Sequence, residues 1–572
     1  MLLSIKDLSH RHRSGDILFS GLNFSIKKNR TGLVGENGTG KSTLIQIIMG
    51  KIKNQKGSVS KDSNFLELPQ NFAPFGHKTV SDILGITKKL NALEKVMAGV
   101  GSNKDILTLD DDWEIKENVR ELLKKANLEH LEFNRSIASL SGGETSKLFF
   151  TSLLTKKPDL ALMDEPTNHL DTEAREFLYD FIKNYPGKLL VVSHDRQLLR
   201  LMDEIIEIRK NKAEIYGGNF DFYRKQRDVE KQAKMTTFRL AERDYRKSIK
   251  KQESTLDAHR KGCKLGAIKA KARNFSKDLV NRKKKRAEDT FKRLKKVHAR
   301  CVDRANETLI KARSKVIAEG MMHIELKPSA ITKGEELLNA KAINYQFENG
   351  DNLWKEKLDF KIEGCDRWHI AGKNGSGKST LIKLLTEKID PVVGKIRNKA
   401  ISIGVIDQNI TILKNEKTIL QNIIDYAPGN QTEDNLRVQL GRFLFYDNDI
   451  HKKIKTLSGG ERVRAAFACL LATDVTPDLL ILDEPNNNLD LNGITQLTNT
   501  LKDYEGTIVV ISHDKDFIED IELSKELLLS KNKPHKTRKL EIKEKNDTKS
   551  IAQISNSRKI ATRPGNSDKT TS

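Results

Sequence analysis

The chain has 572 residues, and at roughly 150 residues per domain this length predicts three to four domains and excludes a mini-protein. Charged residues make up 31% and hydrophobic residues 37%, a composition that indicates globular domains with some strongly polar segments. No window approaches the roughly 18 consecutive apolar residues of a membrane span, and the N-terminal sequence lacks the apolar core of a signal peptide. We therefore expect a soluble, cytoplasmic protein. Four separated cysteines without a CxxC pair predict neither a disulfide framework nor a zinc site.

The formal net charge of +24 is concentrated in two segments. From Arg224 to Gly320 there are 32 Lys and Arg against 12 Asp and Glu, a net charge of +20. From Lys531 to Ser572 there are 12 against 4, a net charge of +8. The rest of the chain is therefore close to neutral.

Four short motifs occur twice in the same order, which indicates two copies of one domain. They are GENGTGKST at 35–43 and GKNGSGKST at 372–380, LSGGE at 140–144 and 457–461, DLALMDEP at 159–166 and DLLILDEP at 478–485, and VVSHD at 191–195 and VVISHD at 509–514. The copies are 337 residues apart at Lys41 and Lys378 but 317 residues apart at the LSGGE serines. The first copy therefore carries about 20 additional residues, which we place in the polar run 91–112 as a loop or short excursion.

The first motif follows an apolar strand and opens a helix, which is the context that makes GxxxxGK[ST] a phosphate loop. Its glycines let backbone amides surround phosphates, its lysine reaches the terminal phosphates and its serine ligates Mg²⁺. The residues predicted to bind the nucleotide are Gly35, Glu36, Asn37, Gly38, Thr39, Gly40, Lys41, Ser42 and Thr43 in the first copy, and Gly372, Lys373, Asn374, Gly375, Ser376, Gly377, Lys378, Ser379 and Thr380 in the second.

Each DEP motif ends an apolar run with two carboxylates, as expected of a buried parallel strand that delivers acids to the ligand-binding edge of a sheet. Asp164 and Asp483 suit the Mg²⁺ shell, and Glu165 and Glu484 suit the polarisation of an attacking water. Acids after a strand are often only helix caps. Their pairing with a phosphate loop favours the catalytic role.

Ser193, His194 and Asp195 are adjacent in the chain, so their side chains point apart and cannot form a hydrolase triad. A lone histidine is commonly structural. Because a histidine follows an apolar strand in both copies, we predict that His194 and His513 contact the γ-phosphate.

The LSGGE pentapeptide resembles the signature of the ATP-binding cassette (ABC) superfamily, over about residues 1–220 and 335–530. The resemblance implies an α/β fold with two ABC-type domains that bind ATP and Mg²⁺ as a head-to-tail pair. Within one chain this pair would be an internal pseudo-dimer, and the protein a monomer. The signature residues open a helix and form an anion site without a lysine, so such a half-site needs a partner. One composite site would pair Lys41, Asp164 and Glu165 with Ser458, Gly459 and Gly460, and the other would pair Lys378, Asp483 and Glu484 with Ser141, Gly142 and Gly143.

The same resemblance implies further roles for single residues. Gln70 and Gln408 match the glutamine that senses Mg²⁺ and the attacking water, and His194 and His513 match the switch histidine. The adenine-stacking position is Phe347 in the second copy and His12 in the first, where a smaller, polar imidazole replaces the phenyl ring. The D-loops are TNHLD at 167–171 and NNNLD at 486–490, and the second departs from the family pattern at two places. Both catalytic glutamates are intact, so we expect two hydrolytic sites of unequal rate.

Residues 221–334 separate the two copies. The stretch up to Gly320 contains no proline and is rich in helix formers, which predicts two long antiparallel helices over 222–256 and 286–318. A helix of about 35 residues reaches roughly 50 Å. We expect the basic stretch 259–286 to form the tip.

Charge runs are usually a solvated surface, but a net +20 on a thin projection repels itself unless a polyanion is present. We therefore predict contact with nucleic acid. Duplex DNA stays open because phosphate contacts carry no base identity. Apolar residues near the tip favour insertion into folded RNA; they are Leu265, Ile268, Phe275 and Leu279.

Two fused cassettes, no membrane span and a long charged linker resemble the ABC-F family. The resemblance implies a cytoplasmic ATPase that binds the ribosome at the exit-tRNA site, with residues 222–320 directed to rRNA, the P-site tRNA and the peptidyl-transfer region. Some members relieve stalled translation and others confer antibiotic resistance, and the sequence does not choose between them. Two alternatives stay open, an ATPase subunit of a membrane transporter and a DNA-associated ABC ATPase.

The predicted domains are a nucleotide-binding domain over 1–220, a basic helical linker over 221–334, a second nucleotide-binding domain over 335–530 and a disordered tail over 531–572.

Overall fold

The computed structural model divides the chain into two compact units. The first comprises residues 1–327, 408–475 and 486–503, and the second comprises residues 328–407, 476–485 and 504–572. The residues whose structure is described are 3–11, 17–61, 64–69, 72–168, 170, 172–209, 212–272, 277–317, 331–346, 350–373, 375–400, 402–427, 432–443, 445, 447–471, 477–487, 489–531 and 534–540. None of the helices in these ranges combines the length and apolarity needed to span a membrane.

A six-stranded sheet forms the centre of the first copy, in the order β5-β6-β7-β3-β8-β9. Its strands are β3 (Arg30–Gly35), β5 (Phe65–Leu68), β6 (Leu160–Asp164), β7 (Lys188–Val192), β8 (Glu204–Arg209) and β9 (Lys212–Tyr216). All neighbours pair in parallel except β8 and β9. Continuous apolar runs such as LALM in β6 are fully buried, as expected for parallel strands covered on both faces.

A smaller antiparallel sheet and several helices complete the first copy. The sheet has the order β2-β1-β4, with β1 (Leu3–Arg11), β2 (Ile17–Ile26) and β4 (Lys56–Lys61). It shares a core with α1 (Lys41–Met49), which follows the phosphate loop. A second core joins the sheet to α2 (Val80–Leu84), α5 (Ile115–Lys125), α6 (Gly142–Lys156), α7 (Thr172–Asn184) and α8 (Arg196–Arg200).

The additional residues of the first copy form two helices, α3 (Thr87–Met97) and α4 (Asn103–Leu109), so the run 91–112 is a short helical excursion and not the loop that the sequence also allowed. A capping box starts α4: the Ser102 hydroxyl accepts from the Asp105 amide at 3.4 Å, and the Asp105 carboxylate accepts from the Ser102 amide at 2.9 Å. The polar composition of the run hid these helices, because half of their residues are exposed and few apolar positions mark a buried side.

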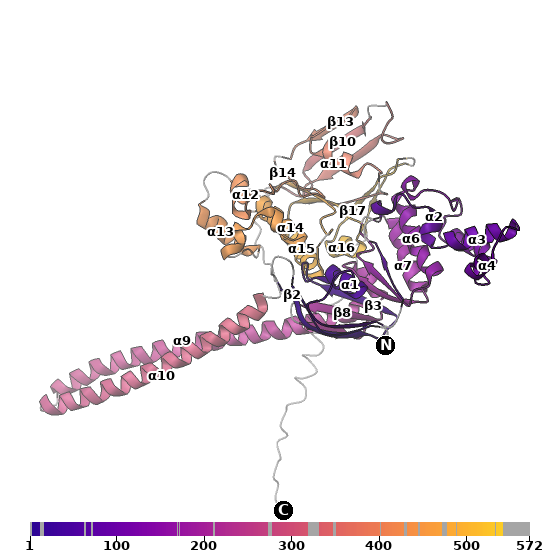
Figure 1. Cartoon of the computed structure of the whole chain (residues 1–572). Coiled ribbons are helices and arrows are strands. Elements are labelled where there is room, and N and C mark those ends of the chain that lie inside the picture. Colours follow the sequence, from indigo (N-terminus) through magenta and orange to yellow (C-terminus); the bar gives the residue numbers. More distant parts are fainter. Residues whose placement is uncertain are drawn as a thin grey trace, which may run out of the picture. The chain divides into compact units, whose positions relative to one another are not determined.

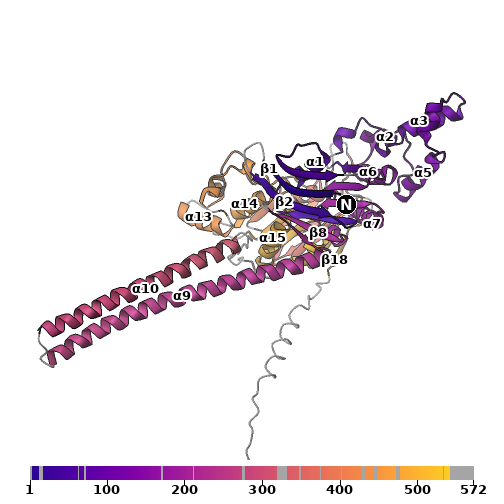
Figure 2. The ribbon, with the colours of Figure 1, turned by 60° about the horizontal axis from the view of Figure 1, so that its bottom comes forward.

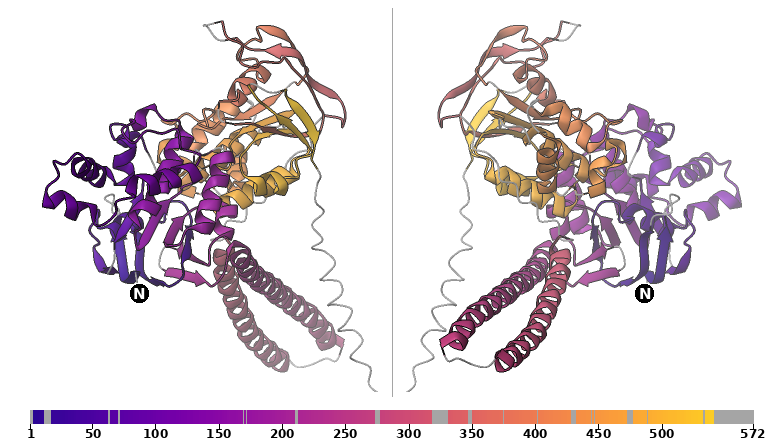
Figure 3. Two further views of the ribbon diagram at one scale, coloured as in Figure 1. Left: turned by 90° about the vertical axis from the view of Figure 1, so that its right-hand side faces the viewer. Right: turned by 90° about the vertical axis from the view of Figure 1, so that its left-hand side faces the viewer.

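The linker forms an arm of two helices, α9 (Phe220–Ala272) and α10 (Lys277–Ile317), which lie side by side (Figures 1 and 2). Both panels of Figure 3 show them as one hairpin. With 53 residues, α9 is about 80 Å long. Two helices are confirmed, but α9 continues past residue 256 to Ala272 and α10 begins before residue 286, at Lys277, so most of the predicted tip is helical. A glycine inside a helix costs only about 1 kcal/mol relative to alanine, and the helix formers around Gly262 and Gly266 outweigh that cost.

The first unit also contains helices of the second copy: α12 (Ile419–Tyr426), α13 (Glu433–Arg442), α14 (Gly459–Leu471) and α15 (Leu491–Asp503). Thr418 caps α12 with a capping box, and Ser458 precedes α14 in the same way that Ser141 precedes α6. The signature helices of both copies therefore start with the same local structure.

The second unit repeats the sheets of the first copy strand by strand. A six-stranded sheet has the order β14-β15-β16-β12-β17-β18, with β12 (Arg367–Ala371), β14 (Ile403–Ile406), β15 (Leu479–Asp483), β16 (Thr507–Ile511), β17 (Lys525–Leu528) and β18 (Lys536–Lys539). A three-stranded sheet has the order β11-β10-β13, with β10 (Glu336–Asn344), β11 (Leu358–Glu363) and β13 (Val393–Asn398). Its helices are α11 (Lys378–Leu385) and α16 (Lys515–Asp520). The α/β class and the duplication are confirmed.

The start of the predicted tail is also different from expectation. Lys536–Lys539 forms β18, which pairs antiparallel with β17, so the ordered domain continues past residue 530. All four residues of β18 are exposed, and its strand is stabilised by main-chain pairing that a composition rich in lysine does not reveal. Residues 541–572 lie outside the described residues.

Candidate nucleotide sites and basic arm

The first phosphate loop lies between the end of β3 and the start of α1. Gly38 and Gly40 have φ values of 79° and 84°, a left-handed conformation that favours glycine and lets the loop curl. The buried Lys41 ammonium donates to the carbonyl oxygens of Gly35 at 2.8 Å and Glu36 at 3.1 Å, so it lies across the mouth of the loop. Burial lowers the pKa of Lys41, and the carboxylates of Glu165, Asp490 and Asp164 oppose this effect.

The second phosphate loop repeats this geometry between β12 and α11. The Lys378 ammonium donates to the carbonyl oxygens of Gly372 at 2.6 Å and Lys373 at 3.3 Å. The Ser379 hydroxyl donates to the Asp483 carboxylate at 3.5 Å. Hydroxyl and carboxylate oxygens are the donors that Mg²⁺ prefers, so Ser379 and Asp483 fit this ion.

The paired acids lie at the ends of β6 and β15: Asp164 and Asp483 are the last residues of these strands, and Glu165 and Glu484 follow them. Glu165 and Glu484 have φ values of 47° and 48°, a strained backbone for residues other than glycine. In each copy the neighbouring strand holds this conformation: the Glu165 amide donates to the Val192 carbonyl at 2.8 Å, and the Glu484 amide donates to the Ile511 carbonyl at 2.9 Å. Strain that recurs in both copies at the same carboxylate indicates a functional position rather than a helix cap.

Each glutamate lies next to the histidine of its own copy. The His194 Nε2 is 3.6 Å from the Glu165 Oε1, and the His513 Nε2 is 3.6 Å from the Glu484 Oε1. Burial lowers the pKa of His194 far below its usual range, and the Lys41 charge adds to this shift, so its ring is neutral. Among the described residues, no hydrogen-bond partner lies at either ring nitrogen of His194 or at the Glu165 Oε1. Buried polar atoms left without partners indicate a place for a polar ligand.

Asp195 has a structural role. Its carboxylate accepts from the Leu198 amide at 3.0 Å, which caps α8, and from the Tyr179 hydroxyl at 2.6 Å. The arrangement agrees with the exclusion of a Ser193–His194–Asp195 triad.

The pH dependence of the first site follows from the burial of Glu165. Burial raises the pKa of this carboxyl to about 8, and Lys41 opposes the shift. A general base acts in its ionised form, and kcat/KM reports the free enzyme. In the Glu484→Gln variant, where only the first site hydrolyses, we expect kcat/KM to rise with pH up to about 8 and then level off. A profile measured from pH 5.5 to 9 that stayed flat above pH 6 would contradict this prediction.

The signature serines cap α6 and α14 and hold the same glutamate in each copy. The Ser141 hydroxyl donates to the Glu144 carboxylate at 2.7 Å, and the Ser458 hydroxyl donates to the Glu461 carboxylate at 2.8 Å. Hydrogen bonds from Ser141 lower the pKa of Glu144 to about 2. Gly142 and Gly143 have open space before them, with no described atom within 4 Å of a Cβ placed there. The α6 N-terminus can therefore accept an anion.

A residue of the second copy touches the first phosphate loop within the first unit. The Asp490 carboxylate accepts from the Asn37 amide at 3.0 Å and from the Gly493 amide at 2.7 Å. Leu491, the next residue, packs against the apolar core of the first copy. The sequence marked Asp490 only as part of a D-loop, and it missed the contact with the loop at Asn37 because the two residues are 453 positions apart.

The remaining predicted site residues are placed as follows. Gln408 is exposed just beyond the end of β14. Gln70, His12, Phe347, Asn374 and Asp171 lie outside the described residues. The two composite sites, with Ser458 and Gly460 opposite Lys41 and with Ser141 and Gly143 opposite Lys378, stay predictions.

The root of the arm is joined to the sheet that carries the first phosphate loop. Arg227 of α9 is 7% exposed; its Nε is 3.6 Å from the Glu207 carboxylate of β8, and its Nη1 is 3.0 Å from the Glu230 carboxylate. The rings of Tyr216 and Tyr223 meet edge to face at 5.0 Å. Because β8 pairs with β3 up to Gly35, two adjacent strands connect the phosphate loop to the arm.

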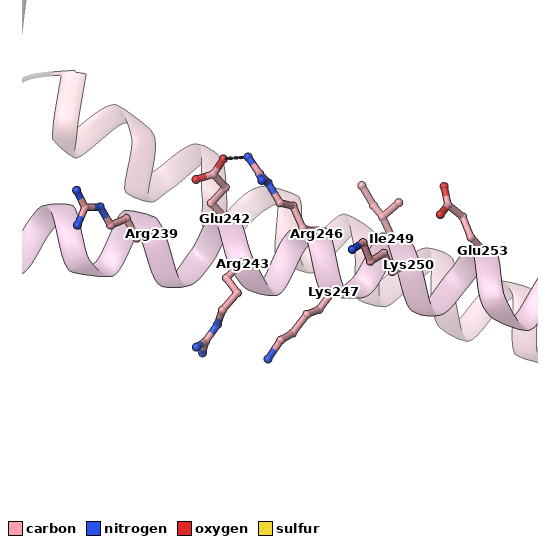
Figure 4. A pocket seen from close by; sticks show the side chains of 8 residues that line it. All are labelled: Arg239, Glu242, Arg243, Arg246, Lys247, Ile249, Lys250 and Glu253. Carbon is pink, nitrogen blue, oxygen red and sulfur yellow. Dashed lines mark hydrogen bonds and ion pairs between the residues drawn. The ribbon is translucent and has the colours of Figure 1, made fainter. Parts of the chain in front are cut away.

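A basic hollow of about 560 Å³ lies along α9. We call five of its residues the basic stripe: Arg239, Arg243, Arg246, Lys247 and Lys250. The Arg246 guanidinium pairs with the Glu242 carboxylate at 2.6 Å, whereas Arg243 and Lys247 point to the other side of the helix (Figure 4). Farther along α9, Leu265 and Ile268 are 57% and 65% exposed. The side chains of Phe275 and Leu279 lie outside the described residues.

The two phosphate loops, the strained glutamates beside histidines and the capped signature helices define an ATP-hydrolysing ATPase of the ATP-binding cassette class. The family model described as "ABC transporter" matches residues 19–168 and 356–487. The ATP-binding protein Uup of Buchnera aphidicola subsp. Acyrthosiphon pisum is 30% identical over 511 residues, covering 87% of this chain and 75% of its own. The Energy-dependent translational throttle protein EttA of Escherichia coli O6:H1 is 29% identical over 518 residues, covering 86% of this chain and 85% of its own.

In its fold, the chain is similar to the archaeal ribosome recycling factor aABCE1 in complex with an archaeal ribosomal stalk protein. The TM-score is 0.55 at 19% sequence identity, covering 93% of this chain and 89% of that one. The chain belongs to the ABC-F family of the ATP-binding cassette superfamily.

Proposed function

We propose that this ATPase acts on the ribosome and that its arm contacts RNA there, in the region of the tRNA and the peptidyl-transfer centre. The observation that carries the proposal is a long, strongly basic arm rooted on the sheet of the first phosphate loop. EttA, whose name describes a translational throttle, supports the choice of the ribosome among polyanions.

The residues of each copy divide the chemistry between them. Lys41 and Lys378 hold the terminal phosphates, and the loop amides surround them. Glu165 and Glu484 accept the proton of the attacking water, and His194 and His513 orient the γ-phosphate next to that water. Mg²⁺, held by Ser42 and Asp164 or by Ser379 and Asp483, would neutralise the charge of the β- and γ-phosphates. Gln70 and Gln408 would position this ion and the water.

The composite arrangement gives nucleotide control over the arm. ATP held by one copy and closed by the signature helix of the other would draw the two copies together, and hydrolysis would release them. Asp490 at the Asn37 amide is the described contact that favours this arrangement at the first site. Because the arm is rooted next to the first phosphate loop, closing would reposition it. This mechanism assigns nucleotide binding to two domains, 1–220 and 335–530 with the strand β18 added, and RNA contact to the linker 221–334.

The proposal predicts which polyanion stimulates the ATPase. We expect ribosomes to raise the steady-state rate of ATP hydrolysis several-fold, and more than equal masses of duplex DNA or of anionic lipid vesicles. The measurement is phosphate release at fixed ionic strength, because phosphate contacts depend on salt. Stronger stimulation by duplex DNA would support a DNA-associated ATPase, and stronger stimulation by vesicles would support a membrane partner. Either result would contradict the proposal.

A further inference from the structure

A buried histidine joins three strands at the second nucleotide site. His369 lies in β12 between β16 and β17, opposite Val510 and Glu526, and is 6% exposed. Its Nδ1 is 3.0 Å from the Glu526 Oε1, and its Nε2 is 3.0 Å from the carbonyl oxygen of Ser512. Both ring nitrogens are therefore engaged, on opposite sides of the ring.

The partners define the hydrogen bonds of this ring. The Ser512 carbonyl oxygen can only accept, so the His369 Nε2 donates to it. The Nδ1 on the other side of the ring lies at the Glu526 carboxylate, which also accepts from Arg538. Hydrogen bonds from His369 and from Arg538 lower the pKa of Glu526. Arg538, Glu526 and His369 thus form a buried hydrogen-bonded chain that fixes a donor on the Ser512 carbonyl.

The Ser512 carbonyl belongs to the peptide unit that begins His513. The His513 Nε2 is 3.4 Å from the Lys378 Nζ and 3.6 Å from the Glu484 Oε1, so this ring lies between the phosphate-loop lysine and the catalytic glutamate. The Ser512 hydroxyl accepts from the Asp514 amide at 3.1 Å, which fixes the other side of the histidine. Rotation of the 512–513 peptide would move the His513 ring away from both groups. A donor that holds this carbonyl therefore holds the ring.

The first copy is built differently at the same place. Gly32 stands three residues before Gly35, as His369 stands three residues before Gly372. A Cβ at Gly32 would meet the Leu199 Cδ2 at 2.9 Å and the Met202 Cγ at 3.1 Å, so packed apolar side chains occupy the space that the imidazole fills in the second copy. The hydrogen bond from His369 to the peptide before the switch histidine is thus a property of the second site.

We propose that His369 is a positioning residue for ATP hydrolysis at the second site, where its ring holds the Ser512 peptide and thereby places His513 beside the γ-phosphate. The inference rests on the proposed hydrolysis at two sites and adds a difference between them. His369 touches neither substrate nor the reacting atoms, so it acts on the turnover step and not on ATP affinity.

The test compares His369 variants in proteins where one site hydrolyses. Glu165→Gln leaves hydrolysis to the second site, and Glu484→Gln leaves it to the first. In the Glu165→Gln protein we expect His369→Leu to lower kcat about tenfold with KM within twofold, and His369→Gln, which keeps one amide donor, to restore part of the rate. In the Glu484→Gln protein the same changes should leave kcat within twofold.

Glu526→Gln gives a second variant that keeps the shape of the strand. It removes the carboxylate that orients the His369 ring through Nδ1, and we expect a smaller loss of kcat at the second site alone. An unchanged kcat in all three variants, an effect on KM alone, or equal losses at both sites would overturn the inference. If the Glu165→Gln protein hydrolyses no ATP, both the inference about His369 and the proposed hydrolysis at the second site are overturned. If the Glu165→Gln protein hydrolyses ATP and the His369 variants do so at the same rate, only the inference about His369 is overturned.

Discussion

Replacing both strand-end glutamates, Glu165→Gln together with Glu484→Gln, is expected to lower the rate of ATP hydrolysis at least about a hundredfold while ATP still binds. Glutamine keeps the length of the side chain but cannot accept a proton from the attacking water, and a general base contributes roughly 10²–10⁴ in rate. The left-handed backbone at both positions is held by the amides that donate to Val192 and Ile511, so the fold of each turn should survive. Phosphate release and equilibrium binding of labelled ATP are the two measurements.

Glu121→Gln with Glu505→Gln is the matched control. Both glutamates are exposed, and each copy again loses one carboxylate. This control should hydrolyse ATP at nearly the normal rate. Hydrolysis by the Glu165→Gln and Glu484→Gln double variant at more than a tenth of the normal rate would contradict the assigned role of these glutamates.

Neutralising the basic stripe by changing its five residues to glutamine is expected to weaken ribosome binding by about two to three orders of magnitude at moderate salt. Each lost phosphate contact removes about 0.7–0.9 from the slope of log affinity against log salt. Glutamine is a good helix former, so α9 should persist. Binding measured over a series of salt concentrations gives both the affinity and the slope.

Five exposed lysines of the first copy provide the control for charge alone: Lys88, Lys104, Lys116, Lys124 and Lys125. Changing them to glutamine removes the same number of charges and should leave the salt slope within about one of its original value. Equal weakening by the two sets would show that net charge, and not the arm, determines binding.

Much of the nucleotide chemistry could be predicted because short motifs set it locally. An apolar strand, a glycine turn and a lysine at fixed spacing predict a phosphate loop, and in the structure Lys41 and Lys378 each donate to carbonyl oxygens of such a turn. The acids at Asp164 and Asp483 follow from buried parallel strands that end at one edge of the sheet. These features depend on neighbours in the chain, which a sequence displays directly.

The features that were missed depend on contacts over long distances or on small differences in free energy. His369 is one polar residue in an apolar strand, and only the fold brings it to Glu526, 157 positions away. Asp490 meets Asn37 for the same reason. The end of α9 was predicted too early because Gly262 and Gly266 suggested a tip. The free-energy cost of a glycine inside a helix is small compared with the cost of ending a helix that packs against a partner helix.

The central claim is that ATP-bound closing directs the basic arm into a ribonucleoprotein. The most direct measurement is co-sedimentation of the Glu165→Gln and Glu484→Gln double variant with purified ribosomes in ATP, with and without the basic stripe. We expect the double variant to pellet with ribosomes in ATP and to stay in the supernatant once the stripe is neutralised, although it still binds ATP. Equal pelleting with and without the stripe would contradict the account.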